Sequence, residues 1–143
     1  MGLILKHHSE KCKNMCINLD QPEKRIAEKE IKVLKVLGRD KNNKLVSPIF
    51  DETWKPGEEK QTNLTVIIDK FEYPREAYRT TSGYYSFSNI LSPDECKGRI
   101  VSCKANLSLR FEVWEAVIPI GSKYVRRNNV ICSNKIRLIK KLC

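Results

Sequence analysis

The last 28 residues interleave basic and apolar side chains and contain no Asp or Glu. Seven Lys or Arg lie among valines, isoleucines and leucines, which is typical of ordered strands rather than of a solvated tail. A folded surface of one sign attracts anions. The pattern therefore favours an anionic ligand, either a nucleic acid or a nucleotide, or else an acidic protein partner.

The seven bases form the candidate electrostatic surface: Lys123, Arg126, Arg127, Lys135, Arg137, Lys140 and Lys141. Because side chains alternate between the two faces of a strand, these bases need not share one face. The candidate aromatic contacts are Tyr84, Tyr85 and Tyr124, with Ser86 beside the first two. Stacking on such a ring contributes about 1–3 kcal/mol per base. The alternative is an ordinary strand in which Tyr84 or Tyr85 packs into the core.

Length and composition fit one globular domain. The chain has 143 residues, 41% of them hydrophobic and 31% charged, and no apolar run reaches the roughly 20 residues that span a bilayer. We predict a single α+β domain over residues 31–143, with a mainly antiparallel sheet and one or two helices. A charged segment, residues 1–30, precedes it and can form a short helix over residues 21–28. We expect no association with membranes.

Turn signals divide the domain into short strands. Apolar runs predict strands over residues 31–37, around 45–50, and over 64–68 and 83–87. Residues 110–118 alternate between apolar and polar side chains, as a half-buried strand does. Residues 123–125 and 130–132 flank a predicted four-residue hairpin connection, and residues 136–142 form the last strand.

The clearest local signal is the Ser-Pro-Asp-Glu sequence at residues 92–95. Ser92 can cap a helix, Pro fits the first helical position, and the Glu95 carboxylate can reach back to the Ser92 N–H. We predict a helix from there to about residue 107. Cys96 and Cys103 share one face of that helix, which is typical of small buried side chains.

The cysteines and histidines do not form a convincing metal motif. Residues 1–5 do not resemble the core of a secretory signal, so we expect reduced thiols and a cytoplasmic location. His7, His8, Cys12 and Cys16 can in principle supply four zinc ligands, but structural zinc sites usually take a second ligand pair from a distant part of the chain. A helix that docks its edge against the domain explains them equally well, and we expect no metal.

Sequence signatures of catalysis and of cofactors are absent. The six glycines are scattered singly, with no Walker-type or dinucleotide pattern, so no cofactor is expected. A histidine-activated nucleophile would need the segment that carries the only two histidines, at residues 7 and 8, to fold over the site. We therefore expect a binding protein rather than an enzyme.

The order of motifs after residue 80 nevertheless resembles a known enzyme family. A Gly-Tyr-Tyr-Ser-Phe-Ser strand at residues 83–88 precedes the capped helix, and Val113–Gly121 and Ile131–Ile139 follow it. This series is similar to the second half of the ADP-ribosyltransferase domain of the poly(ADP-ribose) polymerase type. It also resembles small proteins of bacteria and their phages that share the Ile-Pro-x-Gly-x-x-Tyr pattern and have no assigned activity. The resemblance covers residues 80–142.

The resemblance implies an ADP-ribosyltransferase-like fold in which Tyr84 and Ser86 would contact nicotinamide. Two catalytic features of that family have no counterpart here. Residues 31–38 lack its His-Gly pair, and no acid follows Glu115, although the family places a catalytic Glu on a late strand. We therefore expect a non-catalytic module that binds a phosphate-bearing ligand. A degenerate ADP-ribosyltransferase and a domain for an acidic protein partner are the alternatives.

Overall fold

The computed structural model describes residues 18–19, 23–48, 52–72, 75–102 and 108–143. In these ranges nine strands form one antiparallel sheet, in the order β2-β10-β11-β8-β3-β9-β12-β5, with β4 paired to β3 outside that path. The strands are β2 (Arg25–Ile26), β3 (Ile31–Arg39), β4 (Leu45–Val46), β5 (Glu59–Gln61), β8 (Tyr84–Ser88), β9 (Arg110–Ile118), β10 (Lys123–Arg127), β11 (Val130–Ser133) and β12 (Lys135–Lys141).

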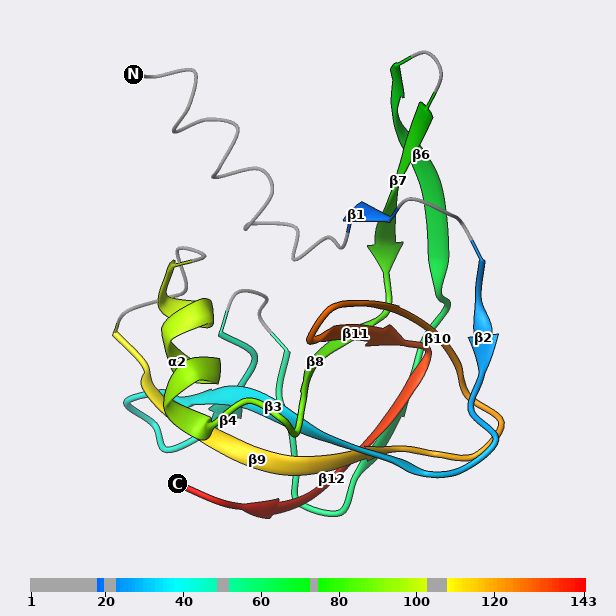
Figure 1. Ribbon diagram of the computed structural model, residues 1–143. Coiled ribbons are helices and arrows are strands. Elements are labelled where there is room, and N and C mark those ends of the chain that lie inside the picture. The colour runs from blue at the N-terminus through cyan, green and yellow to red at the C-terminus, as the bar shows by residue number, and fades with distance from the viewer. Residues whose placement is uncertain (1–17, 20–22, 49–51, 73–74, 103–107) are drawn as a thin grey trace, which may run out of the picture.

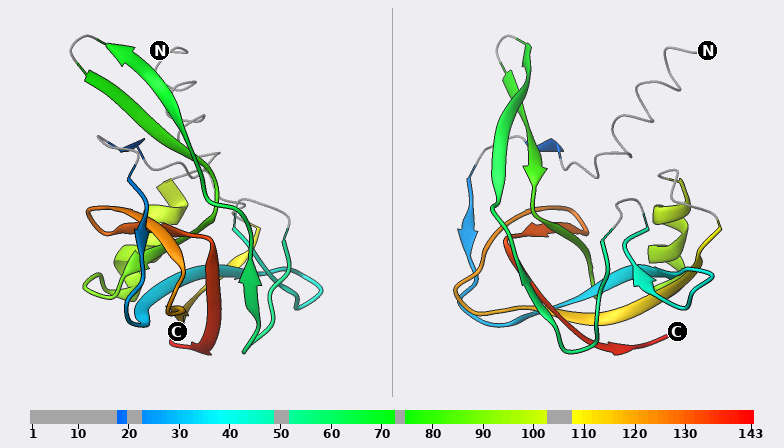
Figure 2. Two further views of the ribbon diagram at one scale, coloured as in Figure 1. Left: turned by 90° about the vertical axis from the view of Figure 1, so that its right-hand side faces the viewer. Right: turned by 180° about the vertical axis from the view of Figure 1, so that it is seen from behind.

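A second, three-stranded sheet has the order β1-β7-β6. It consists of β1 (Asn18–Leu19), β6 (Thr65–Glu72) and β7 (Arg75–Ser82). The β6–β7 hairpin projects well beyond the strongly curved main sheet (Figures 1 and 2). The single described helix, α2 (Pro93–Ser102), lies beside β3 and β9. The expected α+β class with a mainly antiparallel sheet is confirmed. No helix in the described ranges has the length and apolar character to cross a membrane.

Strand β3 separates two apolar clusters because its side chains alternate between the faces of the sheet. Val33 and Leu37 belong to the cluster enclosed by the curved sheet, together with Trp114 of β9. Leu34 and Val36 belong to the cluster under α2, which also contains buried side chains of the helix. All nine residues of β3 pair with β9, from Ile31↔Ile118 to Arg39↔Arg110. This pairing is the spine of the main sheet.

Asn134 closes the curved sheet between β11 and β12. Its main-chain N–H donates to the Lys123 carbonyl at 3.0 Å, and its side-chain oxygen accepts from the Lys123 N–H at 2.9 Å. Its carbonyl accepts from the Thr62 N–H, just after β5, at 2.8 Å. Strands β10 and β5 lie at or near opposite ends of the strand order. One residue therefore joins the two ends of the sheet.

The capping box of α2 is formed as predicted. The Glu95 N–H donates to the Ser92 hydroxyl at 3.2 Å, and the Ser92 N–H donates to the Glu95 carboxylate at 3.0 Å. The backbone hydrogen bond from Ser92, helped by its side chain, lowers the pKa of Glu95. Cys96 is fully buried under the helix, and burial raises its pKa to about 11. Cys103 and the rest of the predicted helix lie outside the described residues.

Three expectations about local structure are corrected. Residues 23–30 contain the strand β2 rather than a helix, and Ala27 is buried in the enclosed cluster, so this stretch packs with the domain. The predicted strand around 45–50 is limited in the described residues to β4. The β10–β11 connection has two residues rather than four, because Asn128 adopts a φ of 55° that allows a tighter turn.

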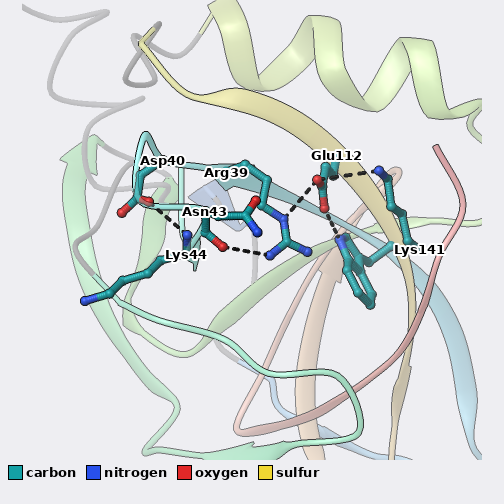
Figure 3. A network of polar contacts seen from close by, with 7 residues as sticks. Arg39, Asp40, Asn43, Lys44, Glu112 and Lys141 are labelled. Atoms are coloured by element: carbon teal, nitrogen blue, oxygen red, sulfur yellow. Dashed lines mark hydrogen bonds and ion pairs between the residues drawn. The ribbon is translucent and has the colours of Figure 1, made fainter.

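A network of polar contacts around the buried Glu112 links β12, the C-terminal strand, to the paired strands β3 and β9. The Glu112 carboxylate accepts from Arg39 Nε at 3.0 Å and from Trp114 Nε1 at 3.1 Å, and it lies 3.6 Å from the Lys141 ammonium. Figure 3 shows Glu112 between Arg39 and Lys141. Burial alone would raise the pKa of Glu112, but the hydrogen bonds from Arg39 and Trp114 and the charges of Arg39 and Lys141 together lower it.

We predict that Glu112→Gln lowers the free energy of unfolding by about 1.5–3 kcal/mol at neutral pH, because charge-assisted hydrogen bonds are lost in a buried site. The folded pKa of Glu112 is depressed, so its contribution is present above the unfolded pKa and is lost as the pH falls through the folded value. Urea unfolding at neutral and at acidic pH measures the difference between wild type and variant. A difference that does not shrink in acid contradicts the role of the charge.

Candidate functional site

The main sheet is open on one side of β3. Strand β8 pairs with β3 only at Val33 and Leu34, and β4 pairs with it only at Gly38 and Arg39. Between these contacts, residues 35–37 of β3 have no strand partner on that side among the described residues. Strand β11 pairs with the other edge of β8 along Tyr84–Phe87, whereas only Phe87 and Ser88 of β8 pair with β3. The two strands therefore diverge.

A cavity of about 230 Å³ lies at this opening. Its polar and charged lining residues are Lys35, Ser47, Glu52, Thr62, Tyr84 and Tyr85, and its other lining residues are Val36, Pro48, Trp54, Gly83, Phe87 and Ile100. Gly83 has a φ of 129°, and a Cβ built there would lie 2.5 Å from the Cys132 sulfur. Only glycine fits between β7 and β8, where the chain carries Tyr84 into the cavity.

Lys35 is the central charge of the cavity. It lies on the same face of β3 as Val33 and Leu37, which belong to the enclosed apolar cluster. Its ammonium donates to the Tyr85 carbonyl at 2.6 Å and lies 5.3 Å from the centre of the Trp54 ring. Burial lowers its pKa from 10.5 to about 8, opposed by the charge of Glu52. No carboxylate in the described ranges forms an ion pair with it.

Trp54 organises one wall of the cavity. Its indole N–H donates to the Ser47 hydroxyl at 2.8 Å, and its buried ring meets the Tyr84 ring edge-on at 5.7 Å. The Lys60 ammonium lies 4.8 Å from the centre of the Trp54 ring and forms ion pairs with Glu52 at 3.0 Å and Glu58 at 3.7 Å. Trp54 is thus held by hydrogen-bond, aromatic and cation–π contacts rather than left open for stacking.

The three candidate tyrosines have different environments. Tyr84 is half-buried and lines the cavity, and burial together with the charges of Glu52 and Glu58 raises its pKa, so that the phenol stays protonated. Tyr85 is buried in the cluster beneath the β6–β7 hairpin, and its hydroxyl lies 2.6 Å from that of Thr80. Tyr124 packs against the enclosed cluster. Of the three, Tyr84 is the one whose ring is available to a ligand in the cavity.

Ser86 lies in the sheet interior. It is buried opposite Ile131 of β11, and its hydroxyl has no hydrogen-bond partner among the described residues. It is not among the residues that line the cavity. The structure therefore does not place Ser86 beside Tyr84 at a shared ligand site.

The seven candidate bases lie on two strands, β10 and β12. Strand β10 is hydrogen-bonded to Asn134 through Lys123, and β12 begins directly after Asn134. Lys123, Arg126 and Arg127 are exposed on β10, and Lys135, Arg137, Lys140 and Lys141 lie on β12. None of them lines the cavity. The bases of β10 and of β12 therefore lie on strands that are not neighbours in the sheet, and outside the cavity.

Carboxylates from other parts of the chain lie among the bases of β12. Arg137 forms an ion pair with Glu30 at 3.1 Å, and Lys141 lies 3.6 Å from Glu112. Lys140 pairs in register with Glu115 of β9. The stretch that has one sign in the sequence has mixed charge in space.

The charged groups and the indole of the cavity lining, Lys35, Glu52 and Trp54, were not among the candidates from the sequence. Lys60, which contacts Trp54 and Glu52 beside the cavity, was not a candidate either. The sequence did contain a signal for Lys35. Residues 33, 35 and 37 share one face of a strand, and Val33 and Leu37 make that face apolar. The others come from loops and from β5, and no local pattern links them to β3.

The four residues that the sequence offered in principle as zinc ligands, His7, His8, Cys12 and Cys16, lie outside the described residues. Within the described ranges, no group of three or more His, Cys, Asp or Glu side chains is arranged to hold a metal ion. Cys96, Cys132 and Cys143 form no disulfide bonds.

Comparisons of the chain with protein-family models, with curated proteins and with solved structures found no match. The resemblance to ADP-ribosyltransferases stays a prediction. Of the two acids on β9 that could replace the missing Glu of that family, Glu112 is held by Arg39 and Trp114, and Glu115 lies in register with Lys140.

We predict that the wild type gains stability relative to Lys35→Met as the pH rises from about 8 to about 10. The pKa of Lys35 is about 8 in the folded protein and about 10.4 in an unfolded chain. Between these values the unfolded state binds more protons, so stability rises with pH. The difference in the free energy of unfolding should change by about 1–3 kcal/mol over this range.

Urea unfolding of both proteins at several pH values measures this change. Lys32→Met is the matched control, because Lys32 is an exposed lysine on the same strand. Its difference from wild type should stay constant with pH. A constant difference for Lys35→Met as well would show that the Lys35 ammonium is not desolvated.

Proposed function

We propose that this protein is a non-catalytic binding module for a small phosphate-bearing ligand, which it holds at the opening between β3 and β8. The observation that carries the proposal is the Lys35 ammonium, which lines a cavity without an ion-paired carboxylate in the described ranges. A buried charge is costly unless it is paired. A bound anion would supply the missing partner.

The rest of the lining suits a ligand with a ring and polar substituents. Tyr84 offers an aromatic face, and Val36, Phe87 and Ile100 are apolar. Hydroxyl groups of the lining can donate hydrogen bonds to a sugar or a base, or accept hydrogen bonds from it. The volume of about 230 Å³ is below the roughly 300–1,000 Å³ of typical ligand sites. The cavity therefore encloses part of a molecule of mononucleotide size, and the remainder extends to the surface.

A nucleotide is favoured over a nucleic-acid strand by the distribution of charge. A strand would need a continuous basic surface, but the bases of β12 lie among Glu30, Glu112 and Glu115. The exposed bases of β10 remain the place where a nucleic acid or an acidic protein would dock. Cys96, Cys132 and Cys143 form no disulfide bonds, as in proteins of the reducing cytoplasm, which is the location we propose.

We predict that ADP, used as a probe nucleotide, binds the wild type and binds Lys35→Met at least about tenfold more weakly, since a charge-assisted contact to phosphate is removed. Affinity should also fall above about pH 8, because Lys35 loses its proton there. Isothermal titration calorimetry measures both effects, and binding below pH 8 should not depend on Lys32→Met.

The same variants separate the alternatives. A single-stranded oligonucleotide tests the β10 surface. If its binding depends steeply on salt, is insensitive to Lys35→Met and is abolished by the double substitution Arg126→Gln and Arg127→Gln, the ligand site lies on β10 rather than at the cavity. Equal affinity of ADP for wild type and Lys35→Met would remove the cavity from the binding site and overturn the proposal.

A further inference from the structure

The contact that holds the Lys35 amine leaves it able to react. Its nitrogen donates to the Tyr85 carbonyl at 2.6 Å. A carbonyl oxygen only accepts hydrogen bonds, so this contact persists when the ammonium loses a proton. The neutral amine then keeps two N–H groups and gains a lone pair. The hydrogen bond fixes the position of the nitrogen at the cavity in both protonation states.

We propose that Lys35 forms a reversible imine with a phosphate-bearing aldehyde bound in this cavity. The inference rests on the proposed function for the phosphate group and adds the chemical class of the ligand. Schiff-base lysines are desolvated amines in pockets, and Lys35 combines a half-buried position at the cavity, an aromatic neighbour and no ion-paired carboxylate in the described ranges.

The groups around Lys35 allow the uncharged amine at moderate pH. Glu52 stabilises the ammonium, and so does Cys132 of β11, whereas Lys60 of β5 opposes it. Desolvation outweighs these charges and leaves the pKa at about 8. At pH 7 about one amine in ten is therefore uncharged. Tyr84 of β8 faces the same cavity as a protonated phenol.

The reaction needs no oxidant, reductant or additional reactant. The lone pair of neutral Lys35 attacks the aldehyde carbon, and the carbonyl electron pair moves to oxygen. That oxygen gains a proton and the nitrogen loses one, which gives a carbinolamine. A second proton on the hydroxyl group lets it leave as water, and the nitrogen lone pair forms the C=N bond. The protonated imine retains one N–H, which can still donate to the Tyr85 carbonyl.

Lys60, the second ammonium at Trp54, is placed differently. It lies within ion-pair distance of both Glu52 and Glu58, whereas Lys35 contacts a neutral carbonyl. The two amines share one aromatic neighbour but differ in their partners. We therefore expect Lys35 to react ahead of Lys60 and ahead of the exposed Lys32.

The test uses pyridoxal 5′-phosphate, a planar ring that carries both an aldehyde and a phosphate. Its imine absorbs in the visible range and is fixed by borohydride reduction, after which peptide mass spectrometry locates the modified lysine. At limiting reagent near neutral pH we expect Lys35 to hold the largest share of label, at least about fivefold above any other lysine. Lys35→Met should remove this fraction, and Lys32→Arg should leave it unchanged.

Pyridoxine 5′-phosphate, with an alcohol in place of the aldehyde, separates this inference from the proposed function. Binding of the alcohol without preferential labelling of Lys35 by the aldehyde would overturn the imine and leave the phosphate site in place. Labelling of Lys35 without binding of the alcohol would support the reactive amine and count against the phosphate. The absence of both would overturn both.

Lys35→Arg provides a second check, because it keeps a positive charge but has no comparable nucleophile. We expect this variant to bind the alcohol and to lose the share of the imine absorbance that Lys35 contributes in the wild type. Its folding is verified by the thermal unfolding transition. An imine signal of wild-type size in folded Lys35→Arg would place the reaction at another lysine and overturn the inference.

Discussion

The hydrogen bonds of Asn134 determine the shape on which the cavity depends. They tie Lys123 of β10 and Thr62, just after β5, to one residue between β11 and β12. Because β11 and β12 are consecutive in the chain but separated in the sheet by β8, β3 and β9, this connection is possible only if the sheet curves back on itself. Strand β8 pairs with β11 along Tyr84–Phe87 and curves with it, so that only its last two residues pair with β3. The curvature that closes the sheet therefore leaves the opening between β3 and β8.

Two charged groups on the paired strands β3 and β9, the buried Glu112 and the half-buried Lys35, have opposite kinds of environment. Glu112 receives hydrogen bonds from Arg39 and Trp114 and lies near the Lys141 ammonium, so its partners outweigh the cost of burial and its pKa is lowered. Lys35 has a carbonyl and an aromatic ring, and burial prevails. The first arrangement stabilises the fold, because both oxygens of the carboxylate have partners. The second leaves a charge for which a ligand can provide the partner.

The local elements were largely predictable, because they depend on neighbours in the chain. The capping box at Ser92 and Glu95 formed as expected, and the alternation over residues 110–118 corresponds to β9. The predicted β10–β11 connection was two residues too long, because Asn128, with its positive φ, allows a tighter turn. The second strand of the projecting hairpin, β7, was not predicted, because its sequence Arg-Glu-Ala-Tyr-Arg-Thr-Thr-Ser lacks an apolar alternation.

The sequence by itself determined the α+β class, the start of the helix and the net positive charge, since each follows from composition or from contacts within a few residues. Only the tertiary structure decided which charges meet. Glu30 reaches Arg137 across more than a hundred residues, and Glu52, Trp54 and Lys60 gather around Lys35 from loops and another strand. Electrostatic and aromatic contacts act through space, so a stretch of one sign can become a mixed surface, and a lysine in an apolar strand can become the centre of a cavity.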